Sequence, residues 1–202
     1  MRIIEADDTR MIDLLGVGPC PRPVDIDQQV TGFKRLKALR IYRFQPGPAI
    51  HGESEVDEVF ILPLAGAFEM EISGAHSFQG RVAAEGPLRA LYMTPHHAYQ
   101  LTPLGPVVVA YARAEAGGRV PVQALTETES DGLAEQLHFW RISLPAGASF
   151  DLGGRETLVH LVRGRLAGKA GALVAGQTLA LDAGEAAALM AEEASDILIL
   201  SA

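Results

Sequence analysis

The 202 residues carry a formal net charge of −8 and contain no basic run, which argues against binding nucleic acid through its phosphates. Hydrophobic residues make up 48% and charged residues 21% of the chain, a balance that excludes an intrinsically disordered protein. The single cysteine, Cys20, excludes an internal disulfide, and no apolar stretch is long enough to cross a membrane. We therefore expect a cytoplasmic globular protein with neither a membrane nor a nucleic-acid partner.

Residues 1–30 are expected to form an N-terminal arm. Within it, the polar run from Asp7 to Thr9 precedes a short apolar segment, and Gly16 follows that segment. This order is typical of a helix start and a helix stop, so it predicts a short helix over residues 10–15.

Short apolar segments follow along the rest of the chain, separated by Gly, Pro, Asp or Ser, and such segments are typical of β-strands. They are Ala38–Phe44, Val59–Leu64, Ala67–Ile72, Ala90–Met93, Val107–Ala112, His138–Leu144, Thr157–Val162, Thr178–Leu181 and Asp196–Leu200. Residues 179–193 are rich in Ala and Glu, but Gly184 interrupts them, so we expect a turn between two strands there. Many short strands in succession predict a sandwich or a barrel.

The two halves of the chain repeat the same landmarks. In the first half Glu58 opens an apolar strand and Gly66 follows it by eight residues; in the second half Glu156 and Gly164 have the same spacing. Such a repeat predicts a duplicated barrel. We assign the first barrel to residues 31–120, a polar linker that includes one helical turn to 121–135, and the second barrel to 136–202.

The densest group of chemically active side chains runs from His51 to Glu58. His51 and Glu53 are two residues apart, so on a strand they leave the same face, and in a barrel that face can be the interior. Glu58 would arrive from the next strand, and either His97 or Gln100 from a later one. Imidazole and carboxylate ligands together suit Mn, Fe, Ni or Zn. The alternative interpretation is a solvated acidic loop at the mouth of the barrel.

These residues also carry a resemblance to a known family. The first cupin motif is similar to Pro46-Gly47 … His51-x-Glu53-x4-Glu58 … Gly66, and the second to Gly86 … Tyr92-Met93-Thr94-Pro95-His96-His97-Ala98-Tyr99-Gln100. The resemblance implies an all-β fold of two double-stranded β-helix (jelly-roll or cupin) barrels in tandem, with a few short helices. It also implies a divalent metal in the first barrel, with Glu53 in place of the second motif histidine.

A narrower similarity covers residues 52–118, which resemble the N-terminal barrel of the bicupin isomerases that act on 5-deoxyglucuronate. In that family the metal-bearing barrel is the C-terminal one. Here the ligand positions of the C-terminal barrel hold Phe150-Asp151-Leu152 and Ala187, and only Glu156 remains. We therefore expect no metal in the second barrel and interpret it as structural.

Two hypotheses about function follow. In the first, the protein is a metal-dependent isomerase or oxygenase that binds a small polar molecule, a sugar or an organic acid, in the first barrel. Tyr92, Tyr99 and Gln100 would orient this ligand, and no residue is assigned to catalysis. In the second, the protein is a non-enzymatic bicupin without a metal that binds a small ligand or self-associates. Both hypotheses are compatible with a homodimer, because edge strands of open barrels are commonly covered by a neighbouring chain.

Overall fold

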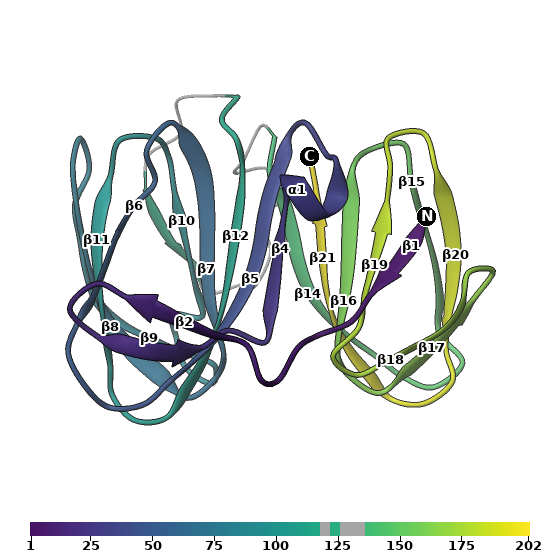
Figure 1. The fold of residues 1–202 in the computed structure, drawn as a ribbon, viewed down its shortest axis with the longest axis horizontal. Coiled ribbons are helices and arrows are strands. Elements are labelled where there is room, and N and C mark those ends of the chain that lie inside the picture. Colours follow the sequence, from purple (N-terminus) through teal and green to yellow (C-terminus); the bar gives the residue numbers. More distant parts are fainter. Residues whose placement is uncertain (118–121, 126–135) are drawn as a thin grey trace.

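The computed structural model describes residues 1–117, 122–125 and 136–202, and it contains two β-barrels side by side (Figure 1). The predicted all-β fold of two tandem barrels is confirmed. The described residues contain one short helix, α1 (Gln28–Thr31), and no helix long and apolar enough to span a membrane. The linker predicted over residues 121–135 falls largely outside the described residues.

The first barrel consists of two antiparallel sheets. In spatial order, its six-stranded sheet contains β13 (Gln123–Leu125), β10 (Ala90–Met93), β7 (Asp57–Ala65), β12 (Val107–Glu115), β5 (Leu36–Phe44) and β4 (Val24–Asp27). Its four-stranded sheet contains β6 (Ile50–Glu53), β11 (Ala98–Pro103), β8 (Ala67–Ser73) and β9 (Phe78–Ala83).

The second barrel repeats this arrangement. Its five-stranded sheet contains β1 (Arg2–Ile4), β19 (Thr178–Leu181), β16 (Thr157–Arg163), β21 (Ser195–Ser201) and β14 (His138–Leu144). Its four-stranded sheet contains β15 (Ser149–Gly153), β20 (Ala186–Ala191), β17 (Arg165–Gly168) and β18 (Gly171–Val174). The nine strands predicted from the sequence are all present, and the predicted turn at Gly184 separates β19 from β20.

Residues 1–30 divide between the two barrels. Strand β1 pairs with β19 of the second barrel, whereas β4 pairs with β5 of the first. Between them, β2 (Met11–Leu14) and β3 (Gly18–Pro21) form a hairpin against the first barrel (Figure 1). The helix predicted over residues 10–15 is therefore wrong. Ile12 and Leu14 alternate with exposed residues and pack against the core of the first barrel, and this period of two favours a strand.

The two large sheets pack face to face and form the junction between the barrels. Along β7, Phe60 and Leu62 belong to the core of the junction, whereas Val59 and Ile61 belong to the core of the first barrel. Phe60 stacks on Phe139 of the second barrel, with ring centroids 4.4 Å apart. Because both faces of these sheets are buried, their strands are continuous apolar runs.

The two Glu residues of the sequence repeat lie at this junction. The carboxylate of Glu156 accepts hydrogen bonds from the backbone N–H groups of residues 34–36, where β5 begins, at 2.6, 2.8 and 2.9 Å. The carboxylate of Glu58 accepts from the backbone N–H of Leu137, just before β14, at 3.0 Å, and of Gly117 at 3.4 Å. Each Glu therefore holds the start of a strand of the other barrel, β5 for Glu156 and β14 for Glu58.

We expect Glu156→Ala to lower the free energy of unfolding by about 3 kcal/mol, because three backbone N–H groups lose one charged acceptor. Glu156→Gln keeps one acceptor oxygen and should cost less. Urea denaturation measures both values. The control is Glu193→Ala, an exposed position where a change within about 0.5 kcal/mol is expected. A loss for Glu156→Ala no larger than that of the control would contradict this role.

His160 makes stability depend on pH. Its side chain is buried at the junction side of β16, with Nδ1 2.9 Å from the hydroxyl of Thr178, and burial lowers its pKa from 6.5 to about 4. The unfolded chain therefore takes up a proton near pH 6.5, whereas the folded chain resists it until about pH 4. The stability that neutral His160 provides is thus lost as the pH falls through this window, by up to about 3 kcal/mol.

Comparison of His160→Gln with the wild type in urea, at pH 7.5, 6 and 5, tests this prediction. The variant should lose less stability than the wild type between pH 7.5 and pH 5. The exposed His76→Gln is the control and should follow the wild type. Parallel pH profiles for the wild type and His160→Gln would show that His160 is not responsible.

Candidate ligand chamber in the first barrel

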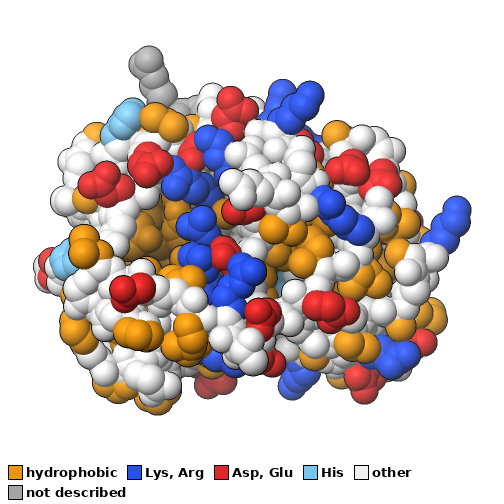
Figure 2. Space-filling model, in the orientation of Figure 1, with side chains coloured by type: hydrophobic (Ala, Val, Ile, Leu, Met, Phe, Trp, Pro, Cys, Tyr) orange, Lys and Arg blue, Asp and Glu red, His pale blue; other side chains and the backbone are white. Residues whose placement is uncertain are grey.

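A cavity of about 150 Å³, here called the chamber, lies between the two sheets of the first barrel. Figure 2 shows this half of the molecule hollowed, with hydrophobic side chains in the hollow and Lys and Arg side chains along one edge. The chamber is lined by Leu14, Tyr42, Phe44, Ile50, His51, Ile61, Tyr99, Leu101, Val109 and Tyr111. The hairpin of β2 and β3 therefore contributes to a site formed mainly by barrel strands.

The wall that β5 and β12 contribute changes from apolar to charged along its length. On β5 and β12, residues such as Ile41 and Ala110 face the junction. Because successive side chains of a strand point to opposite faces, the residues that alternate with them form the wall on the chamber side. Its cross-strand pairs are, in order, Phe44 with Val107, Tyr42 with Val109, Arg40 with Tyr111, and Ala38 with Arg113. The wall thus presents an apolar end, a phenolic middle and a guanidinium end.

Two hydroxyl groups at the chamber have no hydrogen-bond partner among the residues that the structure describes. Gly52 leaves room for the ring of Tyr99, since a Cβ atom at that position would lie 2.4 Å from ring atoms. Neither Tyr99 nor Tyr111 donates or accepts a hydrogen bond through its hydroxyl group within the described residues, and Tyr111 is only 7% exposed. Burial raises the pKa of both phenols, and Arg40 and Arg113 oppose this only in part. At neutral pH both hydroxyls are therefore protonated and able to donate.

Arg40 is a cation without a carboxylate of its own. Among the described residues its one ion pair within 4 Å is with Asp25, whose oxygen lies 3.4 Å from the Arg40 Nε atom. Asp25 is already bound by Arg10 at 2.8 Å and by Arg22 at 2.7 Å. In the part of the chain that the structure describes, the Arg40 guanidinium donates no hydrogen bond, and its Nε atom is buried.

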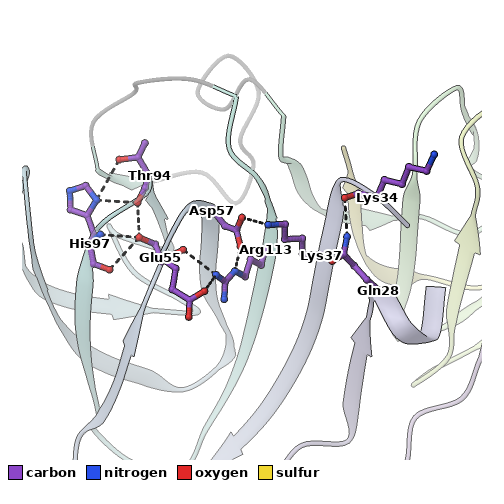
Figure 3. A network of polar contacts seen from close by, with 9 residues as sticks. Gln28, Lys34, Lys37, Glu55, Asp57, Thr94, His97 and Arg113 are labelled. Atoms are coloured by element: carbon purple, nitrogen blue, oxygen red, sulfur yellow. Dashed lines mark hydrogen bonds and ion pairs between the residues drawn. The ribbon is translucent and has the colours of Figure 1, made fainter. Parts of the chain in front are cut away.

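A second charged network lies beside Arg113 and is balanced (Figure 3). Asp57, 2% exposed, binds Lys37 Nζ at 2.5 Å and the Nε atom of Arg113, which also binds Glu55. Burial works against the Arg113 cation, but its hydrogen bonds to the two carboxylates raise its pKa above the ordinary value. Together the two networks contain five cations and three carboxylates, a local charge of +2 in a chain of −8.

A second hollow of about 440 Å³, here called the outer groove, lies on the four-stranded sheet of the first barrel. It is lined by His51, Glu71, Ile72, Ser73, Ser77, Phe78, Gln79, Ala98, Tyr99 and Gln100. His51 faces Gln100 across β6 and β11, and Gln100 in turn faces Glu71 of β8. His51 and Tyr99 line both the chamber and the outer groove.

The predicted metal ligands His51 and Glu53 share one face of β6, but that face is exposed. Ile50 and Gly52 take the alternate positions that point inward. The reason is the strand period of two, by which a shift of a single residue reverses which side chains face the core.

His97, the third predicted ligand, is 2% exposed in the turn between β10 and β11. Its Nδ1–H donates to the carbonyl oxygen of Thr94 at 3.0 Å, and its Nε2 accepts from the backbone N–H of His76 at 3.1 Å. Its backbone N–H donates to the hydroxyl of Ser54 at 2.9 Å. His97 thus connects the turns of the two motifs, and both of its ring nitrogens have partners within the protein; Figure 3 shows the contact with Thr94.

The structure does not bring the four predicted ligands together. His51 and Glu53 lie on the outer face of β6, Glu58 lies at the junction, and His97 lies in its turn. Among residues 1–117, 122–125 and 136–202, no group of three or more His, Cys, Asp or Glu residues is arranged to hold a metal ion. These four residues therefore do not fit a shared Mn, Fe, Ni or Zn ion.

The predicted ligand-orienting residues separate in the same way. Tyr99 lines both hollows, and Gln100 lines the outer groove. Tyr92 is fully buried in the core of the junction, because its neighbours Leu91 and Met93 take the positions that face the first barrel.

Four residues on the chamber side of β5 and β12 were not among the predicted site residues: Tyr42 and Tyr111, which line the chamber, and Arg40 and Arg113, which follow them along the strands. A signal for them was available. They stand at alternate positions in two otherwise apolar strands, and a charged or phenolic side chain repeated at a period of two indicates one polar face. The motif residues drew attention to β6 and to the turns instead.

Comparisons with known proteins agree with the fold. Residues 22–136 match the model of the KduI/IolB family, whereas no curated protein matches the chain. The nickel(II) complex of the pirin YhhW from Escherichia coli is 11% identical, with 99% of this chain and 98% of that chain covered and a TM-score of 0.73. An IolB-like protein from Salmonella typhimurium is 12% identical, with 99% and 92% covered and a TM-score of 0.74.

Oxalate decarboxylase from Bacillus subtilis, a structure described for its Mn(II) centres, is 9% identical, with 100% of this chain and 77% of that chain covered and a TM-score of 0.74. Similarity at this level of identity concerns the fold. The bicupin architecture expected from the two motifs is confirmed over the whole length of the chain.

We expect Gly52→Ala to push the ring of Tyr99 out of place and to lower the free energy of unfolding by about 2 kcal/mol, because the added methyl group overpacks a filled site. The control is Gly47→Ala, whose Cβ would have its nearest neighbour at 3.8 Å and should change stability by less than about 0.5 kcal/mol. Adding Tyr99→Ala should remove most of the penalty at position 52. A penalty at 52 that is independent of Tyr99 in this double-mutant cycle would refute the contact.

Proposed function

The chain belongs to the KduI/IolB family, and on this basis we propose that its first barrel binds a small organic anion, a sugar acid or another organic acid, in the chamber. The observation that carries the proposal is Arg40. Its guanidinium group lies on the chamber side of β5 and has only a 3.4 Å contact to a carboxylate shared with two other arginines. A guanidinium group presents its donors in a planar fork that matches a carboxylate.

The hydroxyl groups of Tyr99 and Tyr111 support the same ligand. Neither hydroxyl has a hydrogen-bond partner within the described residues, so both are available to donate to a ligand in the chamber. Both phenols stay protonated at neutral pH, and a protonated phenol donates to a carboxylate oxygen. Arg40 is the cross-strand neighbour of Tyr111, and its charge acts on the Tyr111 phenol, so cation and hydroxyl belong to one region of the wall.

The charge distribution adds a long-range contribution. An anion is repelled on average by a chain of charge −8, yet the group of cations around Arg40 and Arg113 has a local excess of two positive charges. A concentration of positive charge at the mouth of an apolar cavity raises the local concentration of an anion.

The second barrel is assigned a structural role. Its interior is filled by aliphatic side chains, among them Val159, Leu161, Leu166 and Ile197. Phe150, Leu152 and Ala187, which stand at ligand positions of the second barrel, are part of this packing or lie against it.

Isomerisation of a sugar acid is the second candidate. It is favoured by the family and by the position of His51, whose side chain leaves the exposed face of β6, where the outer groove lies. Isomerisation moves a proton between neighbouring carbon atoms, which requires a base, and His51 with the Tyr99 hydroxyl would provide a base and an acid. Solved structures of proteins with this fold contain nickel or manganese, but a metal here would need ligands other than the four predicted.

Isothermal titration with small carboxylates and their uncharged amides tests the anion proposal. Carboxylates should bind and amides should not. Arg40→Gln should weaken carboxylate binding about tenfold or more, since a charged hydrogen bond is lost. Arg43→Gln is the matched control, because Arg43 lies on the same strand but faces away and pairs with Asp8. Unchanged affinity in Arg40→Gln, or no carboxylate binding at all, would sink the proposal.

Incubation with 5-deoxyglucuronate, alone and with Mn, Fe, Ni or Zn salts, tests the isomerase candidate. Under the anion-binding proposal we expect no turnover and no metal-specific rise of the melting temperature. Turnover that is lost in His51→Ala would favour the isomerase candidate instead, and a metal-specific rise would point to ligands outside the predicted four.

A further inference from the structure

Resting on the proposed binding of an anion, we infer that the ligand is a monocyclic carboxylate with an apolar ring, of the size of benzoate, and not a polyhydroxylated sugar acid. The ring occupies the chamber and the carboxylate reaches Arg40.

The size and lining of the chamber favour an apolar ring. Its volume is about 150 Å³, and an apolar cavity of about this volume accepts one benzene-sized molecule. Four of the lining residues, Ile50, Ile61, Leu101 and Val109, have no polar side-chain atom. Against these four side chains the hydroxyl groups of a sugar would lose their water without gaining a partner, whereas an apolar ring loses nothing.

Two aromatic side chains of the chamber favour a flat ring. Tyr42 and Phe44 both line the chamber, and their rings lie stacked, with centroids 5.3 Å apart and planes 11° apart. Aromatic side chains favour offset-stacked or edge-to-face contact with another ring. These two rings are therefore suited to contact a flat ring that enters beside Val109.

The distance between the apolar pair and the charged pair of the wall matches the length of a ring carboxylate. On the wall of β5 and β12, the pair of Tyr42 and Val109 is two residues from the pair of Arg40 and Tyr111. Two residues of a strand span about 7 Å, close to the length of a six-membered ring with a carboxylate attached. A ring beside Val109 thus directs its carboxylate toward the end of the wall where Arg40 and Tyr111 stand.

The outer groove is the competing location, and it suits a different ligand. Glu71, Gln79 and Gln100 line it with hydrogen-bonding groups, and its volume of about 440 Å³ is larger. A sugar acid would find hydrogen-bond partners in the outer groove, whereas a ring carboxylate would bind in the chamber. Variants of the chamber residues therefore distinguish the two classes of acid.

The experiment compares benzoate and cyclohexanecarboxylate with glucuronate by isothermal titration of the full chain, with benzamide as the uncharged counterpart of benzoate. We expect both ring carboxylates to bind at least about tenfold more tightly than glucuronate and than benzamide. Arg40→Gln should weaken benzoate binding about tenfold, and the conservative Tyr111→Phe should weaken it severalfold through loss of one hydrogen bond.

A pair of variants on the hairpin tests whether the ring enters the chamber. Leu14 lines the chamber and is half-buried, so Leu14→Trp narrows the chamber at a position that tolerates a larger side chain. It should weaken benzoate binding at least about tenfold. The matched control is Leu15→Trp, next along the chain and fully exposed, which should leave binding unchanged.

The outcomes separate the two proposals. Tighter binding of glucuronate than of benzoate, dependent on Arg40, would leave the anion proposal standing and overturn the inference about the ring. Benzoate binding that is indifferent to Leu14→Trp would overturn it as well, since the ring would then lie outside the chamber. Absence of binding for all three acids would overturn both.

Discussion

The whole molecule depends on the burial of both faces of its two large sheets. Each sheet packs one face against the other sheet and the opposite face against its own smaller sheet. Every second residue of β5, β7 and β12 is thereby committed to the junction, and only the remaining residues are available to the first barrel. Arg40, Tyr42 and Tyr111 belong to this remaining set, so the packing between the barrels determines which side chains can form a ligand site.

The same constraint explains the role of the repeated Glu. Where a strand of a barrel begins beside the opposite sheet, its backbone N–H groups are buried and need acceptors. Glu156 and Glu58 supply these acceptors reciprocally across the junction. A residue that resembles a metal ligand in the motif therefore serves as a structural acceptor, and its counterpart in the second barrel does the same.

The fold could be predicted largely from local pattern. Apolar segments such as those of β7 and β16 are long and continuous, and the repeated spacing of Glu and Gly identified two equivalent units. Residues 10–15 were mispredicted because their short apolar stretch is compatible with a helix or a strand, and only contact with the core of the first barrel favours the strand. The candidate site was predicted less well, since a strand pattern states which residues share a face but not which face is buried.

The sequence by itself determined the all-β class, the duplication and the similarity of the first half to a cupin barrel, because these depend on composition and on spacing along the chain. The tertiary structure decided that His51 and Glu53 face outward, that Glu58 lies at the junction, and that Arg40 and Tyr111 stand beside the chamber. The physical reason is the period of two in a strand: one residue of register exchanges its two faces, and register is set by pairing and packing with segments that are distant in the chain.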